Sequence, residues 1–225
     1  MNLVKKKFYS NFQSLKDKYP NQTANFWNNI ESSFCYSIID SGSPSILLLV
    51  NDKSTSNVAN RIKSDMLEFF SLVLSYVPEI RTNELVIDPL SGELAFLLKN
   101  EKFDAAKKYV DTRLEVIFGS GKRVALVQNI ERLPFSTMVL FYTYGDDIIN
   151  AKYPGTIIIF TLELSSEFNL KSLERKKILQ SCSQLTVLVE NYLTDLYSAN
   201  VHEDQLKPLF TRIANNIIFI NEEIN

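Results

Sequence analysis

The segment Gly119–Lys122 reads Gly-Ser-Gly-Lys, a composition that could cradle the phosphates of a nucleotide. A working phosphate loop follows the pattern G-x-x-x-x-G-K-[ST] and stands between a strand and a helix, whose free N–H groups face the phosphates. Here Val116 replaces the first glycine, and Arg123 stands where the loop needs a Ser or Thr for magnesium. An amphipathic helical pattern precedes the segment and an apolar run follows it, which inverts the required order. We therefore interpret the segment as a helix-to-strand turn, with Gly119 as the left-handed residue that closes the helix.

In a fold of this kind, a phosphate loop would stand directly after the first buried strand. There the chain reads Asn51-Asp-Lys-Ser-Thr-Ser-Asn57, which has no glycine to let the backbone wrap a phosphate and which carries the repelling charge of Asp52. The acidic pair that holds the metal would follow a second apolar strand, where the neutral Gln128 and Asn129 stand. Because both halves of a nucleotide site are missing from the pattern, we expect no ATP and no cofactor on this chain.

Other reactive side chains do not form a recognisable catalytic set. His202 is the only histidine, and a hydrolase would need it beside a nucleophile such as Cys182 together with an orienting acid. The two cysteines, Cys35 and Cys182, lack metal-binding spacing, and the sequence leaves open whether they pair. Tyr142 is predicted to belong to the core. The triplet that begins at Asn21 is a candidate N-glycosylation site.

Strands and helices alternate along the chain. Continuous apolar runs of strand length indicate strands that are buried on both faces, and apolar residues spaced three and four apart indicate helices. This alternation predicts an α/β fold with a mostly parallel central sheet flanked by helices. The predicted strands are 45–50, 84–88, 123–128 and 156–162, the predicted helices are 24–39, 58–77, 103–117, 136–144, 170–196 and one that begins near Gln205, and residues 217–220 are extended.

The totals are those of a folded globular chain. It has 225 residues, of which 45% are hydrophobic and 22% charged, and its net charge of −2 with scattered basic residues argues against nucleic-acid binding. No apolar run approaches the roughly 20 residues that cross a bilayer, and no signal peptide is visible. Residues 1–22 are polar and lysine-rich, and we interpret them as a tether with one helical turn at most, followed by a single domain over residues 23–225.

The stretch between the third and fourth predicted strands carries an ordered set of motifs. It contains Glu131-Arg-Leu-Pro134, the pair Ser136-Thr137, Val139-Leu-Phe-Tyr142 with Tyr144, and then Asp146 and Ala151. Near the end stands Leu206-Lys-Pro-Leu-Phe-Thr-Arg-Ile213. Together with Phe26-Trp27 and 44–50, this set resembles the luminal domain of the torsin-activating cofactors, the lamina-associated polypeptide and torsin-interacting protein family, over roughly residues 24–220.

This resemblance implies a fold and a function. The implied fold is AAA+-like, or P-loop-like, without a nucleotide site. The implied function is to bind a torsin AAA+ ATPase in the endoplasmic reticulum lumen and perinuclear space, in the place of a neighbouring subunit, and to donate an arginine finger to the ATP and magnesium that torsin holds. Arg212 matches that arginine, and Phe210 stands where the family has tryptophan. Glu131 matches a family glutamate that either supports the interface or accepts backbone N–H groups near Leu133 and Pro134.

By its spacing, Arg212 lies roughly 60° outside the apolar arc of its helix and can face a partner. The chain departs from the vertebrate pattern at Gly145, where the family has a cysteine that pairs with one near the C-terminus, so we expect packing alone to hold the C-terminal segment. No membrane contact is expected of this segment, although the parent protein is expected to carry a membrane anchor. Two alternatives stay open: an adaptor that binds its partner without stimulating it, and a cryptic nucleotide-binding protein.

Overall fold

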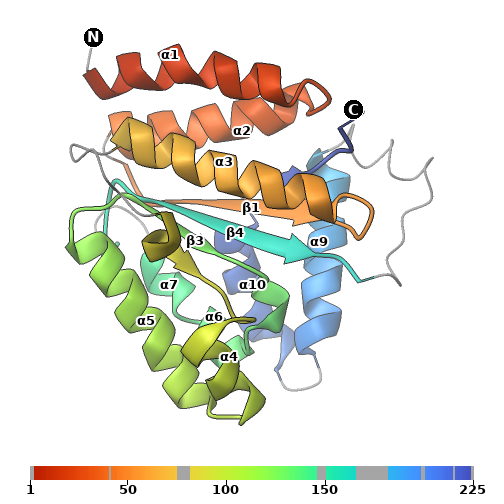
Figure 1. Cartoon of the computed structure of the whole chain (residues 1–225). Helices are drawn as coiled ribbons and strands as arrows, with labels where there is room; N and C mark the ends of the chain where they lie inside the picture. The colour runs from red at the N-terminus through yellow and green to blue at the C-terminus, as the bar shows by residue number, and fades with distance from the viewer. Residues whose placement is uncertain are drawn as a thin grey trace.

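The computed structural model describes residues 3–40, 42–74, 82–145, 151–165, 182–198, 201–214 and 216–223. Its centre is a five-stranded, fully parallel sheet in the order β2-β3-β4-β1-β5 (Figure 1). All seven residues of β1 are buried, and so are all residues of β4 except Glu163 at its end. This confirms the predicted α/β fold. The strands are β1 (Ser45–Asn51), β2 (Val86–Ile87), β3 (Val124–Val127), β4 (Ile157–Glu163) and β5 (Ile217–Phe219).

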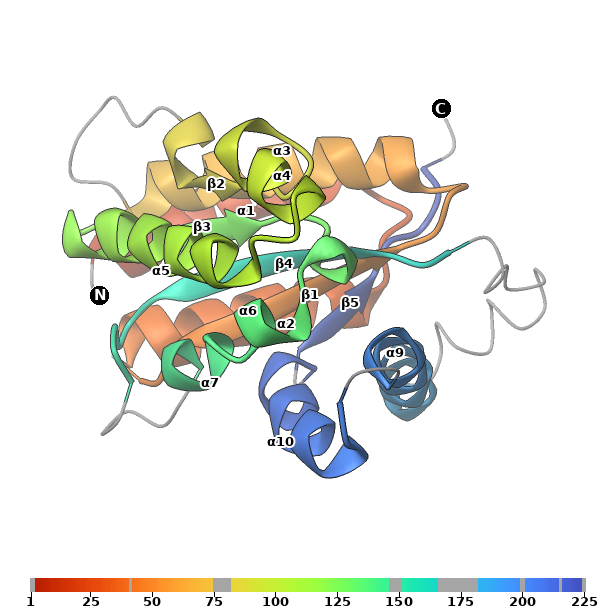
Figure 2. The ribbon, with the colours of Figure 1, turned by 90° about the horizontal axis from the view of Figure 1, so that it is seen from below.

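Helices cover both faces of the sheet (Figures 1 and 2). On one face, α2 (Ala24–Phe34), which continues into the π-helical turn Cys35–Ile39, contacts β1 and β5, and α3 (Ser56–Leu74) contacts β1 and β3. On the other face, α5 (Phe103–Gly119) contacts β3, α10 (Glu203–Ile213) contacts β1, and α9 (Cys182–Tyr197) contacts β5. The short helices α6 (Phe135–Met138) and α7 (Phe141–Tyr144) lie on this second face beside α5 and α10.

The predicted N-terminal tether is wrong. Residues Leu3–Lys18 form a helix, α1, that lies outside α2 and α3 as an additional layer (Figure 1). Phe8 is fully buried: its ring stacks on Phe34 of α2 with centroids 3.8 Å apart and meets Phe69 of α3 edge-on at 5.3 Å. The sequence hid this helix because its apolar stripe is narrow and many lysines surround it, yet three aromatic rings pack together only once α2 and α3 are adjacent.

Smaller differences concern element boundaries. The predicted strand 84–88 is a 3₁₀ turn (Thr82–Leu85) followed by β2, the predicted helix 136–144 is the pair α6 and α7, and α4 (Gly92–Lys99) was not predicted. Residues 170–181 of the predicted helix 170–196, and the end of the predicted helix 58–77, lie outside the described part of the chain.

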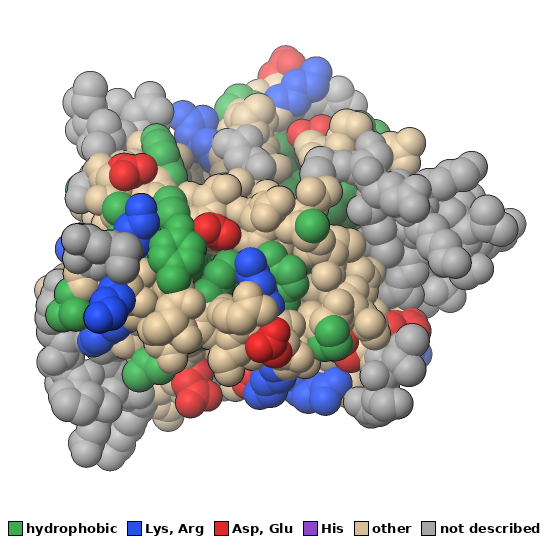
Figure 3. Space-filling view, turned by 90° about the horizontal axis from the view of Figure 1, so that it is seen from above, with side chains coloured by type: hydrophobic (Ala, Val, Ile, Leu, Met, Phe, Trp, Pro, Cys, Tyr) green, Lys and Arg blue, Asp and Glu red, His purple; other side chains and the backbone are tan. Residues whose placement is uncertain are grey.

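The surface that carries α1 is mixed in character. Lys and Arg side chains alternate there with acidic and apolar ones, so the described residues on this face form no continuous basic surface (Figure 3). Within the described ranges, no helix combines the length and the apolar character that a membrane span needs.

Candidate functional site

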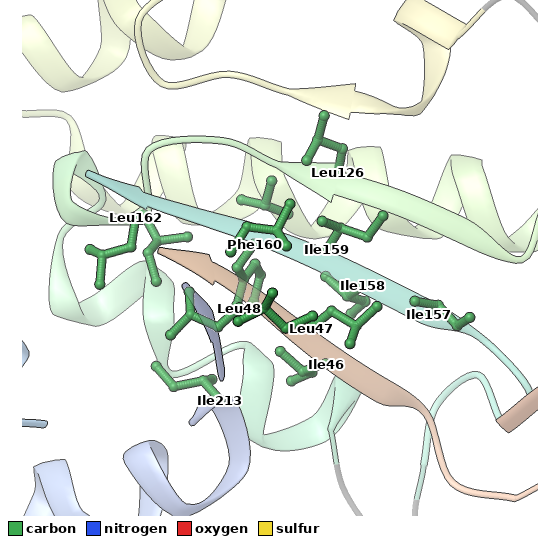
Figure 4. Close-up of a cluster of buried hydrophobic side chains, with 14 of the residues drawn as sticks. Ile46, Leu47, Leu48, Leu126, Ile157, Ile158, Ile159, Phe160, Leu162 and Ile213 are labelled. Carbon is green, nitrogen blue, oxygen red and sulfur yellow. The ribbon is translucent and has the colours of Figure 1, made fainter. Parts of the chain in front are cut away.

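Helix α10 presents Arg212 by burying the opposite side of the helix. Four of its side chains are buried, and Figure 4 shows Ile213 pointing toward the apolar side chains of β1. Contacts with α7 and α9 hold the helix from two further sides. The part of the predicted arc up to Ile213 is therefore confirmed, whereas Ile217, which we had also expected on it, lies in β5. Arg212 is half-buried at the margin of the arc rather than inside the core. The buried set is Leu206, Leu209, Phe210 and Ile213.

Contacts with α7 and with its own helix orient the Arg212 guanidinium. Its Cζ lies 5.3 Å from the ring centroid of Tyr142 in α7, which is within the range of a cation–π interaction. Its Nη1 donates a hydrogen bond to the carbonyl of Pro208, one turn earlier, at 3.3 Å. The Tyr142 hydroxyl in turn donates to the carbonyl of Gln205, in the first turns of α10, at 2.7 Å. Tyr142 was predicted to be core, but it is half-buried and contacts both ends of this helix.

Pro208 occupies a different place in α10 than the sequence indicated. The helix begins at Glu203, so Pro208 is its sixth residue and not part of a first turn. A proline inside a helix removes the N–H that would bond to the carbonyl four residues earlier, here Asp204. The first half of α10 therefore depends more than usual on contacts from outside the helix.

The segment that follows α10 bonds to β1 before the loop that ends this strand. Asn216, which follows α10, accepts a hydrogen bond from Leu48 N at 2.9 Å, and its side-chain amide donates to the carbonyl of Ile46 at 3.4 Å. Asp52 stands four to six residues further along the chain, which at about 3.3 Å per residue is roughly 13–20 Å.

The loop after β1 is closed by its own carboxylate. Asp52, only 5% exposed, accepts hydrogen bonds at Oδ1 from the backbone N–H groups of Ser54 and Thr55, at 3.0 and 3.1 Å. The same oxygen accepts from the Ser54 and Thr55 hydroxyls, at 2.7 and 3.1 Å. In a phosphate loop such donors at a helix N-terminus face the nucleotide. Here these donors bond to the Asp52 carboxylate.

Gln128 and Asn129, which follow β3, make hydrogen bonds to neighbouring elements. The Gln128 side chain accepts a hydrogen bond from Lys63 Nζ of α3 at 2.5 Å, and burial lowers the pKa of Lys63 against the opposing effect of Asp88 and nearby glutamates. Asn129 adopts a left-handed conformation with φ of 49°, and its N–H donates to the Thr161 hydroxyl of β4 at 2.9 Å. These neutral amides connect neighbouring elements. No group of three His, Cys, Asp or Glu side chains within the described ranges could hold a metal ion.

Glu131 supports the end of β4. Its Oε2 accepts from the backbone N–H of Glu163 at 3.4 Å. Burial raises the pKa of the Glu131 carboxyl to about 7, against the opposing effect of backbone N–H groups and Arg132. Glu131 also lines a pocket of about 630 Å³ whose walls are largely apolar. The turn that carries it is fixed by Tyr197, whose hydroxyl donates to the carbonyls of Ile130 and Leu133 at 3.2 and 3.1 Å.

The Glu131 carboxyl predicts a pH-dependent effect on stability. A carboxyl whose pKa is higher in the folded than in the unfolded state binds protons more tightly when folded, so the free energy of unfolding falls as pH rises from about 4.5 to about 7. Glu131→Gln, which keeps an acceptor for Glu163 N, should therefore have a higher Tm than the parent chain at pH 8, and the difference should shrink toward pH 5. Thermal unfolding of both chains across this range checks it. A difference that is constant with pH would contradict the assignment.

The Gly119–Lys122 segment is the predicted helix-to-strand turn. It joins α5 to β3, and Lys122 forms an ion pair with Glu84 at 2.8 Å. The left-handed residue, however, is Gly121, with φ of 82°, because α5 continues through Gly119.

The other positions singled out from the sequence are Phe210, the two cysteines and Gly145. Phe210 is 3% exposed, which makes it a support of α10 and not a contact surface. Cys35 is a free thiol, and the Cys182 side chain lies outside the described residues. A Cβ at Gly145 would come within 2.9 Å of Ile46 Cδ1, so the packing closes tightly around this glycine.

Hydrogen bonds hold the C-terminal segment to the turn before α2. The Gln22 side chain donates to the Asn221 carbonyl at 3.0 Å and to Glu223 Oε1 at 2.8 Å, and it accepts from Asn221 N at 3.0 Å. We had expected packing alone to hold the C-terminal segment, but these hydrogen bonds hold it as well. Asn21 is exposed in this turn, and its side-chain amide donates to the Glu222 carbonyl at 3.3 Å.

Comparison with known proteins places this fold. The family described as lamina-associated polypeptide 1, AAA+ activator domain, matches residues 1–224. Torsin-1A-interacting protein 1 of Bos taurus is 26% identical over 220 residues, and those of Mus musculus and Homo sapiens are 24% identical over 221. Each alignment covers 96% of this chain but only 34–36% of the relative, so the chain spans about a third of their length. The chain thus belongs to the family of the lamina-associated polypeptide 1 AAA+ activator domain.

Proposed function

We propose that this chain is a non-catalytic activator of a torsin AAA+ ATPase, which binds the ATP-loaded partner and supplies Arg212 to the partner's ATP in trans. The observation that carries the proposal is the placement of Arg212. Arg212 is half-buried in the last turn of a helix that packs against α7, α9 and β1. We infer that Arg212 contacts a phosphate held by the partner protein and not one held by its own chain.

The chemistry of ATP hydrolysis suits this residue. Negative charge spreads over the transferred phosphoryl group in the transition state. A guanidinium is permanently charged and donates two parallel hydrogen bonds from a planar fork, which lysine does not have. An arginine finger supplied by a partner is worth about 10³–10⁵ in rate, roughly 4–7 kcal/mol of barrier.

The proposal gives the nucleotide and its magnesium to the partner. Support comes from Asp52, whose carboxylate accepts the N–H groups that would otherwise bind phosphate. Support also comes from Gln128, which bonds to Lys63 in the place of a metal-binding acid. A triphosphate bound in the loop after β1 would have to displace the Asp52 carboxylate from its N–H donors.

The cellular setting is part of the same proposal. A partner of the torsin type places this domain in the endoplasmic reticulum lumen or perinuclear space, attached to a membrane anchor elsewhere in the parent protein. The relatives are named for interaction with torsin-1A, and the chain matches about a third of each. The function proposed here is therefore that of the domain.

The test combines purified chain, torsin and ATP and measures phosphate release. We expect the chain to stimulate release by torsin, to release none alone, and to show no binding of labelled ATP at micromolar concentration. Association without stimulation would favour the adaptor alternative. Micromolar ATP binding by the isolated chain would favour the cryptic nucleotide-binding alternative.

Asn21 provides a prediction about location. It is exposed in a turn, and one N–H of its amide would still be available to Glu222 after glycosylation of the other. In cells that express the parent protein, glycosidase treatment should increase its electrophoretic mobility, and Asn21→Gln should remove this response. Asn28→Gln, an exposed asparagine without a sequon, serves as the control. A wild-type protein that is insensitive to glycosidase would contradict the prediction.

A further inference from the structure

A single side chain outside α10 contacts both of its ends. The Tyr142 ring lies under the guanidinium of Arg212, the penultimate residue of the helix, with 5.3 Å between Cζ and the ring centroid. Its hydroxyl donates to Gln205, the third residue, at 2.7 Å. Tyr142 belongs to α7, which contacts α10 directly, so its backbone is fixed by a separate element.

Such a contact matters because an arginine side chain is long and has many rotamers. Ordering it costs conformational entropy, and an arginine that is ordered before its partner arrives does not lose that entropy on binding. A flat aromatic face restrains the guanidinium without consuming its N–H donors, since the attraction acts on the charge. The Tyr142 contact therefore restrains the group through its charge and does not itself use an N–H donor.

The hydroxyl contact meets α10 where the helix is weakest. Pro208 leaves the Asp204 carbonyl without its helical donor, and Gln205 is the next residue. Burial raises the pKa of Tyr142, against the opposing effect of the Arg212 charge and the Leu209 N–H, so the hydroxyl stays protonated at neutral pH and can donate. The two contacts together fix the helix and its arginine relative to α7.

We infer that Tyr142 is a positioning residue, which holds the Arg212 guanidinium in the orientation that reaches the ATP of the partner. This inference rests on the proposed function. Tyr142 does not touch the nucleotide and acts only through Arg212. The ring is the essential part, and the hydroxyl is a secondary support of the helix.

The experiment measures torsin phosphate release against the concentration of the chain, for wild type, Tyr142→Phe and Tyr142→Leu. We expect the maximal stimulated rate to fall about tenfold for Tyr142→Leu, equivalent to about 1.4 kcal/mol, and to stay within about twofold for Tyr142→Phe. The chain concentration for half-maximal stimulation should be unchanged in both, since association does not depend on the ring. Tyr36→Leu, an exposed tyrosine on the α2 side, should equal wild type. In an Arg212→Ala background, Tyr142→Leu should have no further effect.

A second measurement does not depend on the folding of the leucine variant. Fluorinated phenylalanines at position 142 keep the shape of the ring and weaken its negative face, so stimulation should fall stepwise with each added fluorine. Tyr142→Leu with a wild-type or a higher maximal rate would overturn the inference, since a higher rate means that the tyrosine restrains Arg212 in an unproductive place. Fluorination without effect would overturn it as well. A wild-type chain that fails to stimulate torsin would overturn the proposed function, and the inference with it.

Discussion

Arg212→Ala should reduce the torsin ATPase rate measured with the chain to that of torsin alone, while the two proteins still associate. Lys207, the other basic residue of α10, stands five residues earlier on the helix and therefore points in a different direction. An arginine finger supplied in trans raises the hydrolysis rate by about 10³–10⁵, so the rate can fall by up to this factor, down to the basal rate of the partner. Phosphate release gives the first part of the result, and co-purification or a binding titration gives the second.

Two further variants make this test specific. Lys207→Ala removes an exposed positive charge from the same helix and should leave stimulation unchanged. Arg212→Lys keeps the charge without the planar fork and should restore only part of the stimulation. Arg212 is half-buried and contacts Tyr142, so its replacement should cost the fold about 1 kcal/mol or less. Equal stimulation by the wild-type and alanine chains would remove Arg212 from the mechanism.

Phe8→Ala should lower the free energy of unfolding by about 3–5 kcal/mol, the usual cost of removing a fully buried aromatic ring. Phe8 is 0% exposed and packs against Phe12, Phe34 and Phe69, so its loss leaves a cavity between three helices. Urea unfolding of both chains measures the difference. Deletion of residues 1–22 should have a still larger effect, because it exposes the aromatic faces of α2 and α3.

The control for this prediction lies on the same helix. Leu3 is also apolar but 62% exposed, so Leu3→Ala should change the free energy of unfolding by less than about 0.5 kcal/mol. If Phe8→Ala behaves like Leu3→Ala, then α1 is not part of the folded domain in solution and the tether interpretation returns.

The sheet could be predicted from the sequence because its long strands are simple local patterns. The runs at 45–50 and 156–162 are apolar without interruption, and only a strand covered on both faces needs such a run. Helix α10 could be predicted equally well, since its apolar side chains recur at helical spacing and place Arg212 outside their arc. The short elements were harder to predict: β2 has two residues and α7 has four, too few for a period to show.

Contacts between distant segments account for what the sequence did not reveal. Tyr142 is 70 residues from Arg212, and in an apolar stretch it reads as an ordinary core residue. Asp52 was recognised as a charge that repels phosphate, but its direct bonds to the loop's N–H groups depend on the turn that the backbone takes. The Gln22 contacts with Asn221 and Glu223 join the two ends of the chain, and no local pattern indicates them.

The sequence by itself determined the parallel sheet, the broken phosphate-loop pattern and an arginine on the margin of an amphipathic helix, because composition and periodicity are properties of neighbouring residues. Only the tertiary structure decided that α1 packs as part of the fold, that Asp52 accepts the N–H groups of its own loop and that Tyr142 lies under Arg212. Each of these depends on side chains from separate elements meeting in space, and their contact energies exist only after the sheet and its two helical layers have assembled.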